Sequence, residues 1–161
     1  MIKIDKDGLL LCEIQAKTFE LSYDALNCSS AVFIRRYMNS EIVKTLDSKD
    51  FLYSSMNEKD ILMELDKEYT ASDYGSVKYS KNELYWIGYI YRYYAYTYQI
   101  SSRKAYKDIK PSELRQLFLP YHTLSPMQTV ERILESKNRV SDKTELEKQF
   151  EIFRQIRLNH K

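Results

Sequence analysis

Glycine and proline are scarce in this sequence, with three residues of each in 161. Sandwiches and barrels of short β-strands need many tight turns, and glycine and proline are the residues that most often form them. Their scarcity therefore disfavours an all-β fold and favours helices joined by short loops.

Cysteine and histidine are also rare, with two residues of each. Cys12 and Cys28 are too few for a disulfide framework, and two histidines supply little for a metal centre. We therefore expect both cysteines to be free and buried, and we expect neither a metal site nor a cofactor.

Long apolar runs and signatures of known catalytic sites are absent as well. No stretch approaches the roughly 20 apolar residues of a membrane span, and the first eight residues, MIKIDKDG, lack the pattern of a signal peptide. The spacings GxGxxG, HExxH, CxxC and GxSxG and the phosphate-binding loop do not occur. These absences favour a cytoplasmic protein that is not an enzyme, with no catalytic residues.

Apolar and charged residues are both plentiful. Hydrophobic residues make up 43% of the chain and charged residues 30%, enough for a sizeable core on a soluble surface. Residues 41–73 carry four lysines against nine acidic residues, whereas residues 103–161 carry thirteen lysines or arginines against eight acidic residues. This uneven distribution of charge either orients a partner on approach or reflects solvated helix faces of different sign.

The tyrosine-rich segment 83–100, ELYWIGYIYRYYAYTYQI, decides the expected architecture. Ser80 and Glu83 have the spacing of a capping box, which predicts a helix that runs to about Gln99. Such a helix is apolar around most of its circumference and is therefore buried at the centre of a domain. Gly88 and Ala95 predict a close approach of another backbone. The sequence thus predicts an all-α, compact multi-helix domain around this helix.

Further helices are expected on both sides of the central one. They cover residues 9–26, 31–38, a short stretch after Ser40, 57–69, 103–109, two segments that begin near Pro111 and Pro126, and a final amphipathic helix to Leu158 capped at Ser141 or Thr144. Residues 71–79 are expected to form a loop with Gly75 at its centre. We divide the chain into a helical core domain, 1–138, and a C-terminal helical extension, 139–161.

The extension carries an apolar stripe of Leu146, Phe150 and Phe153, with Ile152 and Ile156 beside it. Three uses of this stripe remain open at the level of sequence. The helix folds back on the domain, pairs with a second copy, or lies in a groove of a partner protein.

Arg92 and His122 are the polar residues that attract most interest. An arginine on a buried helix needs an acid or carbonyl groups around it, so Arg92 forms an internal salt bridge with Glu83 or an acid of residues 57–69, or it binds a partner. His122 stands between two prolines in LPYHTLSP without a flanking carboxylate, which favours loop packing over general-base catalysis.

Residues 19–38 contain a possible helix-turn-helix. A second helix at 31–38 would present Arg35 and Arg36 to a DNA major groove. Glu20, Asp24 and the acidic segment that follows oppose this interpretation, because DNA repels acidic surfaces.

Four blocks of sequence resemble a small uncharacterised bacterial family. They are residues 29–40 (SSAVFIRRYMNS), 85–93 (YWIGYIYRY), 109–115 (IKPSELR) and 119–124 (LPYHTL), and the similarity spans about Cys28–Glu135. Members of that family are encoded beside toxin-like proteins, including ones similar to ADP-ribosyltransferases. The resemblance implies an antitoxin that neutralises its cognate toxin by direct binding, and it supplies no established binding residues.

We therefore expect a non-enzymatic protein-binding protein, with a helix-turn-helix DNA-binding regulator as the alternative. From their residue types and the resembling blocks, we select Arg92, Tyr96, Tyr121 and His122 as partner-binding residues. Arg35 and Arg36 are the DNA-binding candidates of the alternative.

Overall fold

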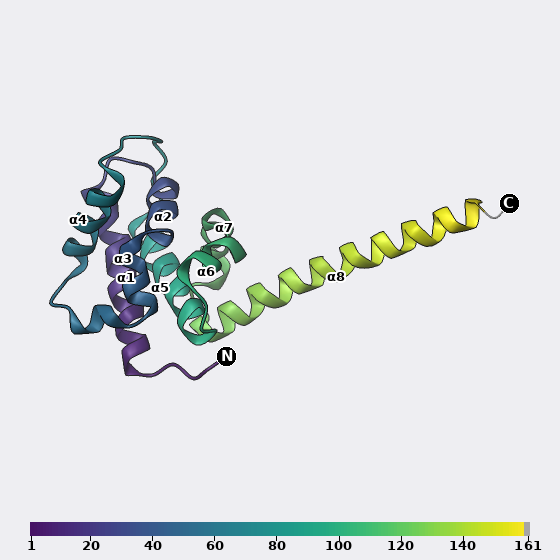
Figure 1. Cartoon of the computed structure of the whole chain (residues 1–161), viewed down its shortest axis with the longest axis horizontal. Helices are drawn as coiled ribbons and strands as arrows, with labels where there is room; N and C mark the ends of the chain where they lie inside the picture. The colour runs from purple at the N-terminus through teal and green to yellow at the C-terminus, as the bar shows by residue number, and fades with distance from the viewer. Residues whose placement is uncertain (160–161) are drawn as a thin grey trace. The chain divides into compact units, whose positions relative to one another are not determined.

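The computed structural model describes residues 1–159, except for the side chains of residues 140–143, so His160 lies outside the described residues. Within this part the chain has no β-strand, which confirms the all-α fold class (Figure 1). The helices are α1 (Lys6–Ala25), α2 (Ser30–Met38), α3 (Glu41–Asp47), the 3₁₀ helix η1 (Asp50–Tyr53), α4 (Glu58–Tyr69), α5 (Lys81–Thr97), α6 (Ser102–Asp108), α7 (Pro111–Tyr121) and α8 (Pro126–Asn159).

Short polar side chains begin most of these helices where the sequence predicts. Helices α2, α3 and α6 follow Ser29, Ser40 and Ser101, and each of these side chains accepts a hydrogen bond from a backbone N–H of the first turn. The capping box of α5 is also confirmed. The Glu83 backbone N–H donates to Ser80 Oγ at 3.1 Å, and the Ser80 N–H donates to Glu83 Oε1 at 3.0 Å.

Helix α5 lies at the centre of the body, the compact unit of residues 1–124, and packs most extensively against α1. A Cβ atom on Gly88 would lie 2.8 Å from Cγ of Phe19 and 3.0 Å from the carbonyl oxygen of Gln15, so only glycine permits this approach. The Gln15 side-chain amide donates to the Gly88 carbonyl oxygen at 2.9 Å. The close backbone approach expected at Gly88 is therefore present, and α1 is the helix that makes it.

The core collects large side chains from the first five α-helices. Fully buried members are Leu11, Phe19, Phe33, Ile34, Tyr37, Met38, Leu46, Ile61, Leu84, Ile87 and Tyr91. The ring of Phe19 meets those of Phe33 and Tyr37 edge-on, with centroids 5.1 and 5.0 Å apart. Such edge-to-face pairs add to the free energy gained by burying the rings.

The loop expected over residues 71–79 is present between α4 and α5, with Gly75 at a φ of +79°. The start of α2 holds this loop in place. Ser29 N–H donates to the Tyr74 carbonyl oxygen at 3.0 Å, and the Tyr79 N–H donates to Ser30 Oγ at 2.9 Å. The loop backbone thereby finds partners that a strand or helix would otherwise supply.

The chain divides into two compact units, Met1–Leu124 and Ser125–Lys161. The boundary that we drew at 138/139 falls inside α8, and the expected start of a separate final helix at Ser141 or Thr144 is wrong. No glycine or proline follows Pro126, so nothing in the sequence stops the helix. At the other end, Asp5 caps α1 through the Gly8 N–H at 2.8 Å, and the helix begins three residues before Leu9.

Candidate functional site

Arg92 lies in the interior of the body, with only 1% of its surface exposed. Its Nη1 donates to Asp47 Oδ1 at 2.6 Å, and its Nε and Nη2 donate to Gln15 Oε1 at 3.0 and 2.8 Å. Nη2 also donates to Ser102 Oγ at 2.7 Å. Three other helices thus supply the partners that a buried guanidinium requires.

The acceptors around Arg92 are themselves held in place. Asp47 accepts from the backbone N–H of Ser102 at 3.0 Å and from its hydroxyl at 2.6 Å, while the Tyr37 hydroxyl donates to Gln15 Oε1 at 3.0 Å. Burial raises the pKa of Tyr37 above its usual range, so this phenol stays protonated as the donor. The network joins α1, α2, α3, α5 and α6 in one cluster.

The acid that pairs with Arg92 differs from the ones that we predicted. Glu83 pairs instead with Arg115 at 3.1 Å, and the acid that reaches Arg92 is at the end of α3 rather than on residues 57–69. The internal salt bridge exists, with Asp47 as its acid. Because Arg92 is buried, it is not available in this structure for direct contact with a partner.

Tyr96 is half-buried and ties the N-terminal segment to α5. Its hydroxyl donates to Asp5 Oδ1 at 2.6 Å, and the ammonium of Lys49 lies 5.0 Å from the centre of its ring. The Tyr96 hydroxyl and the Gly8 N–H lower the pKa of the Asp5 carboxyl. The Tyr96 hydroxyl is therefore engaged within the chain, and its use in partner binding remains a prediction.

The end of α7 brings the other two selected residues to the surface. The His122 ring stacks on Phe118 at 4.8 Å between centroids, and Phe118 meets Trp86 of α5 edge-on at 5.7 Å. Nδ1 of His122 lies 2.9 Å from the Phe118 carbonyl oxygen, which only accepts, so Nδ1 carries the proton. The neighbouring side chain of Leu119 is 78% exposed.

We call Trp86, Phe118, Leu119, Tyr121 and His122 the aromatic surface. Trp86, Phe118 and Tyr121 are half-buried, and contacts with Trp86 and His122 hold the Phe118 ring in place. The spacing of four between Phe118 and His122 is visible in the sequence as a contact on one helix face. The contribution of Trp86, 32 residues earlier in the chain, becomes visible only in the fold.

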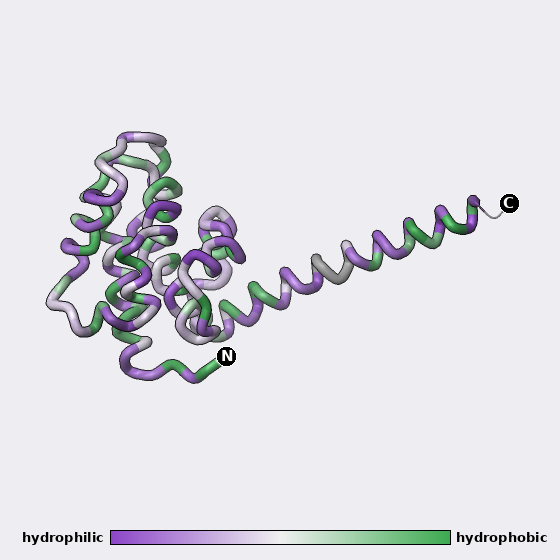
Figure 2. Tube along the Cα trace, viewed as in Figure 1, coloured by the Kyte–Doolittle hydropathy of each residue, from purple (hydrophilic) through white to green (hydrophobic). Residues whose placement is uncertain are grey.

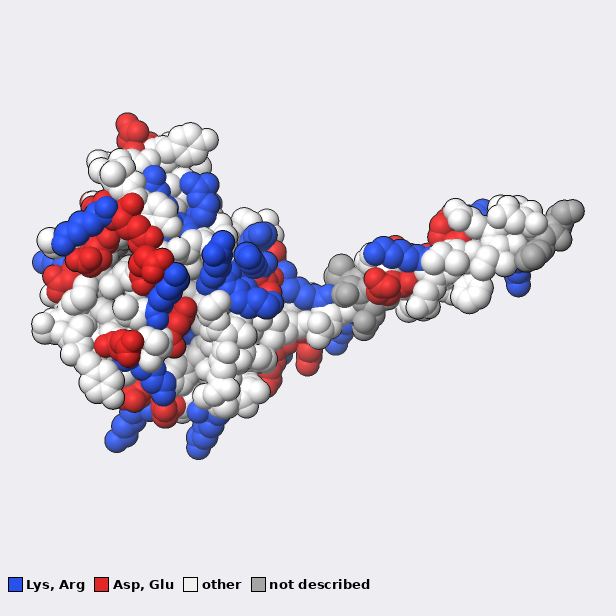
Figure 3. Space-filling model, in the orientation of Figure 1, with Lys and Arg blue, Asp and Glu red and all other residues white. Residues whose placement is uncertain are grey.

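The two arginines of the DNA-binding alternative differ in their surroundings. Arg35 is exposed, whereas Arg36 is half-buried and donates from Nη1 to the Thr70 carbonyl oxygen at 2.9 Å. The Arg36 guanidinium also lies 5.4 Å from the centre of the Tyr69 ring. Arg36 therefore joins α2 to the end of α4. Figure 3 shows acidic side chains gathered over α4, the helix that ends at Tyr69.

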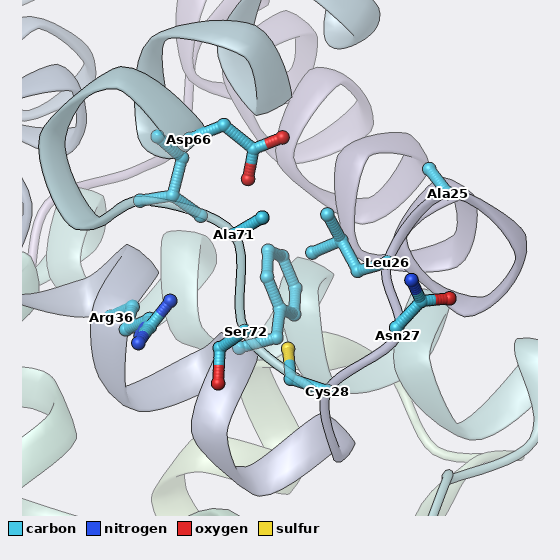
Figure 4. Close-up of a pocket in the computed structure, with 10 residues that line it drawn as sticks. Ala25, Leu26, Asn27, Cys28, Arg36, Asp66, Ala71 and Ser72 are labelled. Atoms are coloured by element: carbon cyan, nitrogen blue, oxygen red, sulfur yellow. The ribbon is translucent and has the colours of Figure 1, made fainter. Parts of the chain in front are cut away.

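A small pocket lies beside the loop between α4 and α5. Figure 4 shows Leu26 and the thiol of Cys28 pointing into it. Its volume is about 70 Å³, well below the roughly 300 Å³ at which small-molecule sites begin. Both cysteines are free and buried, as expected, and burial raises the pKa of the Cys12 thiol to about 12. Protonated at neutral pH, the Cys12 thiol is a poor nucleophile.

Among the residues that the structure describes, no three side chains of the metal-binding types His, Cys, Asp and Glu come together in a way that could hold an ion. In the same residues, no helix has both the length and the apolar character needed to cross a membrane.

Residues 144–159 of α8 present an apolar stripe whose members are all exposed. The exposed fraction of Leu146 is 54%, that of Phe150 is 71% and that of Phe153 is 66%. Ile152 and Ile156, the neighbours expected from the sequence, are exposed as well. Figure 2 shows hydrophobic residues recurring along the end of this helix. The predicted amphipathic helix is therefore present, within the continuous α8.

Comparisons with known proteins gave no match: no family model, curated protein or solved structure is similar to this chain.

Proposed function

We propose that this chain is a non-enzymatic protein-binding protein, the antitoxin of a bacterial toxin–antitoxin pair. The observation that carries the proposal is the aromatic surface, where Leu119 stands 78% exposed beside stacked rings. Apolar side chains held in this way gain free energy when a partner covers them, at about 25 cal/mol for each Å² removed from water.

The composition of the surface suits protein recognition. Aromatic side chains are common at the energetic centres of interfaces, because they offer a large area and lose little conformational entropy. Here Phe118 already holds the His122 ring by stacking, so the binding of a partner would order few additional side chains. The Tyr121 hydroxyl adds a polar group that orients the partner. We expect the matching site to be a shallow apolar pocket with hydrogen-bonding groups at its rim.

The partner follows from the family resemblance. The resembling blocks include residues 119–124, which form most of the aromatic surface, and 85–93, which contain Trp86. The cognate toxin, of the ADP-ribosyltransferase-like kind, is the proposed partner, and covering its active cleft would inhibit it by exclusion of substrate. Of the selected residues, Tyr121 and His122 are the proposed contacts.

Co-expression with each neighbouring gene product, followed by pull-down and a growth assay, tests the proposal. We expect a stable complex that restores growth. Leu119→Ser and His122→Ala should each weaken toxin binding at least tenfold, the loss expected for an interface centre. Tyr53→Ser is the matched control, because Tyr53 is 92% exposed on η1, outside the aromatic surface. Two outcomes would contradict the proposal: no complex with any neighbour, or a complex that Leu119→Ser leaves unchanged.

A second candidate function is the DNA-binding regulator, and the exposed position of Arg35 on α2 favours it. Neutralising phosphates releases counterions, so binding to the upstream DNA should weaken steeply as salt rises. Arg35→Ala would then reduce the salt dependence and Arg36→Ala would act mainly on stability, because Arg36 bonds Thr70. Absence of binding at low salt would exclude this function.

A further inference from the structure

The distal part of α8 combines an exposed apolar stripe with an ordered arrangement of charges. At 3.6 residues per turn, Leu146, Phe150 and Phe153 fall within about 60° of one another on the helix surface, and Arg157 continues the same line. Their spacings of four, three and four residues are those of a coiled-coil seam. Figure 3 shows a mostly uncharged surface along the end of this helix.

The two flanks of the seam differ. Ile152 and Ile156 extend the apolar area on one side. On the other side, Glu147 and Arg154 stand two turns apart, one acidic and one basic, at the positions beside a seam where interhelical ion pairs form. Seven residues separate them, too far for an ion pair within one helix. Both side chains are exposed, so a second helix can reach their charges.

We propose that two copies of this chain pair through the distal stripe, with the two α8 helices antiparallel. In this arrangement Phe150 of each copy packs against Phe153 of the other at the centre. Glu147 of each copy then faces Arg154 of the other, which makes two equivalent ion pairs across the symmetry axis. Ile156 packs on the opposite flank of the seam.

The charges select the antiparallel orientation over the parallel one. A parallel pair would set Arg157 of one copy against Arg157 of the other within the seam, where like charges repel. The antiparallel pair sets Arg157 beside Leu146 of the second copy, which the apolar stem of arginine covers. Acidic residues also predominate in the first half of the segment and basic residues in the second, so antiparallel copies match opposite signs.

The exposed apolar area sets the expected strength. Burying Leu146, Phe150, Phe153 and Ile156 would remove on the order of 400 Å² per copy from water, below the roughly 800 Å² per partner of a standard stable interface. We therefore expect a reversible dimer with a Kd in the micromolar range. The aromatic surface belongs to the other compact unit, so this inference stands independently of the proposed function.

Charge reversal in the full chain tests the pairing. Analytical ultracentrifugation across a concentration series should show a monomer–dimer equilibrium for the natural sequence. Glu147→Arg and Arg154→Glu should each weaken the dimer at least tenfold, because each places like charges opposite one another twice. An equimolar mixture of these two variants should form a heterodimer, since both cross-pairs are then attractive. Phe153→Ala changes no charge and should abolish the dimer by removing an apolar contact at its centre.

Lys148→Glu is the matched control, since it reverses a charge on the opposite face of the same helix. Circular dichroism of each variant verifies that α8 remains helical. A natural chain that stays monomeric at roughly 100 μM, far above the expected Kd, would overturn the proposal. A dimer that neither charge reversal weakens, or two single variants whose mixture remains monomeric, would overturn it as well.

Discussion

Arg92 of α5 and Asp47 at the end of α3 form an ion pair of 2.6 Å, in which the guanidinium is 1% exposed and the carboxylate 19% exposed. The two partners are therefore unequally desolvated. The basic side depends on the protein for all of its hydrogen bonds, whereas the acidic side retains some water. This asymmetry predicts unequal costs when either residue is replaced.

Removal of the acid should cost more than removal of the base. Asp47→Ala leaves a buried guanidinium without its counter-charge and should lower the free energy of unfolding by about 3 kcal/mol. Arg92→Met fills a similar volume with apolar atoms and leaves Asp47 with Ser102 and water, so we expect a loss of about 1–2 kcal/mol. Urea denaturation of both variants measures the two losses. Equal losses, or a larger loss in Arg92→Met, would contradict this account.

Gly88→Ala tests the close packing of α1 on α5. The added methyl group would meet Phe19 at 2.8 Å and the Gln15 carbonyl oxygen at 3.0 Å, and a carbonyl oxygen in the middle of α1 cannot easily move away. We expect a loss of about 1–3 kcal/mol in thermal or urea unfolding. Helix propensity alone would give a gain of nearly 1 kcal/mol, so the sign of the change decides between the two effects.

The features that the sequence predicted correctly are local ones. Ser80 and Glu83 stand three residues apart, and such a capping box forms or fails within one turn of helix. The burial of α5 was likewise predictable, because apolar residues surround almost its whole circumference. These inferences need no knowledge of which other helix lies nearby.

The features that could not be predicted depend on distant parts of the chain. Asp47 lies 45 residues before Arg92, and nothing in the sequence distinguishes it from the other eight acidic residues of the segment 41–73. Trp86 joins Phe118 through the packing of α5 on α7, for the same reason. Exposure of Leu119 is also a property of the fold alone.

The contact between Asp5 and Tyr96 predicts a dependence on acid. The Tyr96 hydroxyl, together with the Gly8 N–H, lowers the pKa of Asp5 from its ordinary value of 3.8. A lowered pKa in the folded state means that this stabilisation is present above the ordinary value and is lost as the pH falls through the folded value. In Tyr96→Phe, an NMR titration of the carboxyl should show the Asp5 pKa rising toward 3.8. An unchanged pKa would exclude the hydroxyl as its cause.

The half-buried Tyr89 and the buried Tyr91 and Tyr94 of α5 predict unfolding in base. Burial raises the pKa of Tyr89 from 10.0 to about 12, and it raises those of Tyr91 and Tyr94 further, with the Asp108 carboxylate adding to the effect at Tyr94. Because the folded state disfavours the phenolate, the stabilisation is complete below pH 10 and is lost as the pH rises through the folded values. Absorbance at 295 nm reports tyrosinate and far-ultraviolet circular dichroism reports helix. We expect these tyrosines to ionise together with the loss of helix; full ionisation of all tyrosines with the helices intact would contradict their burial.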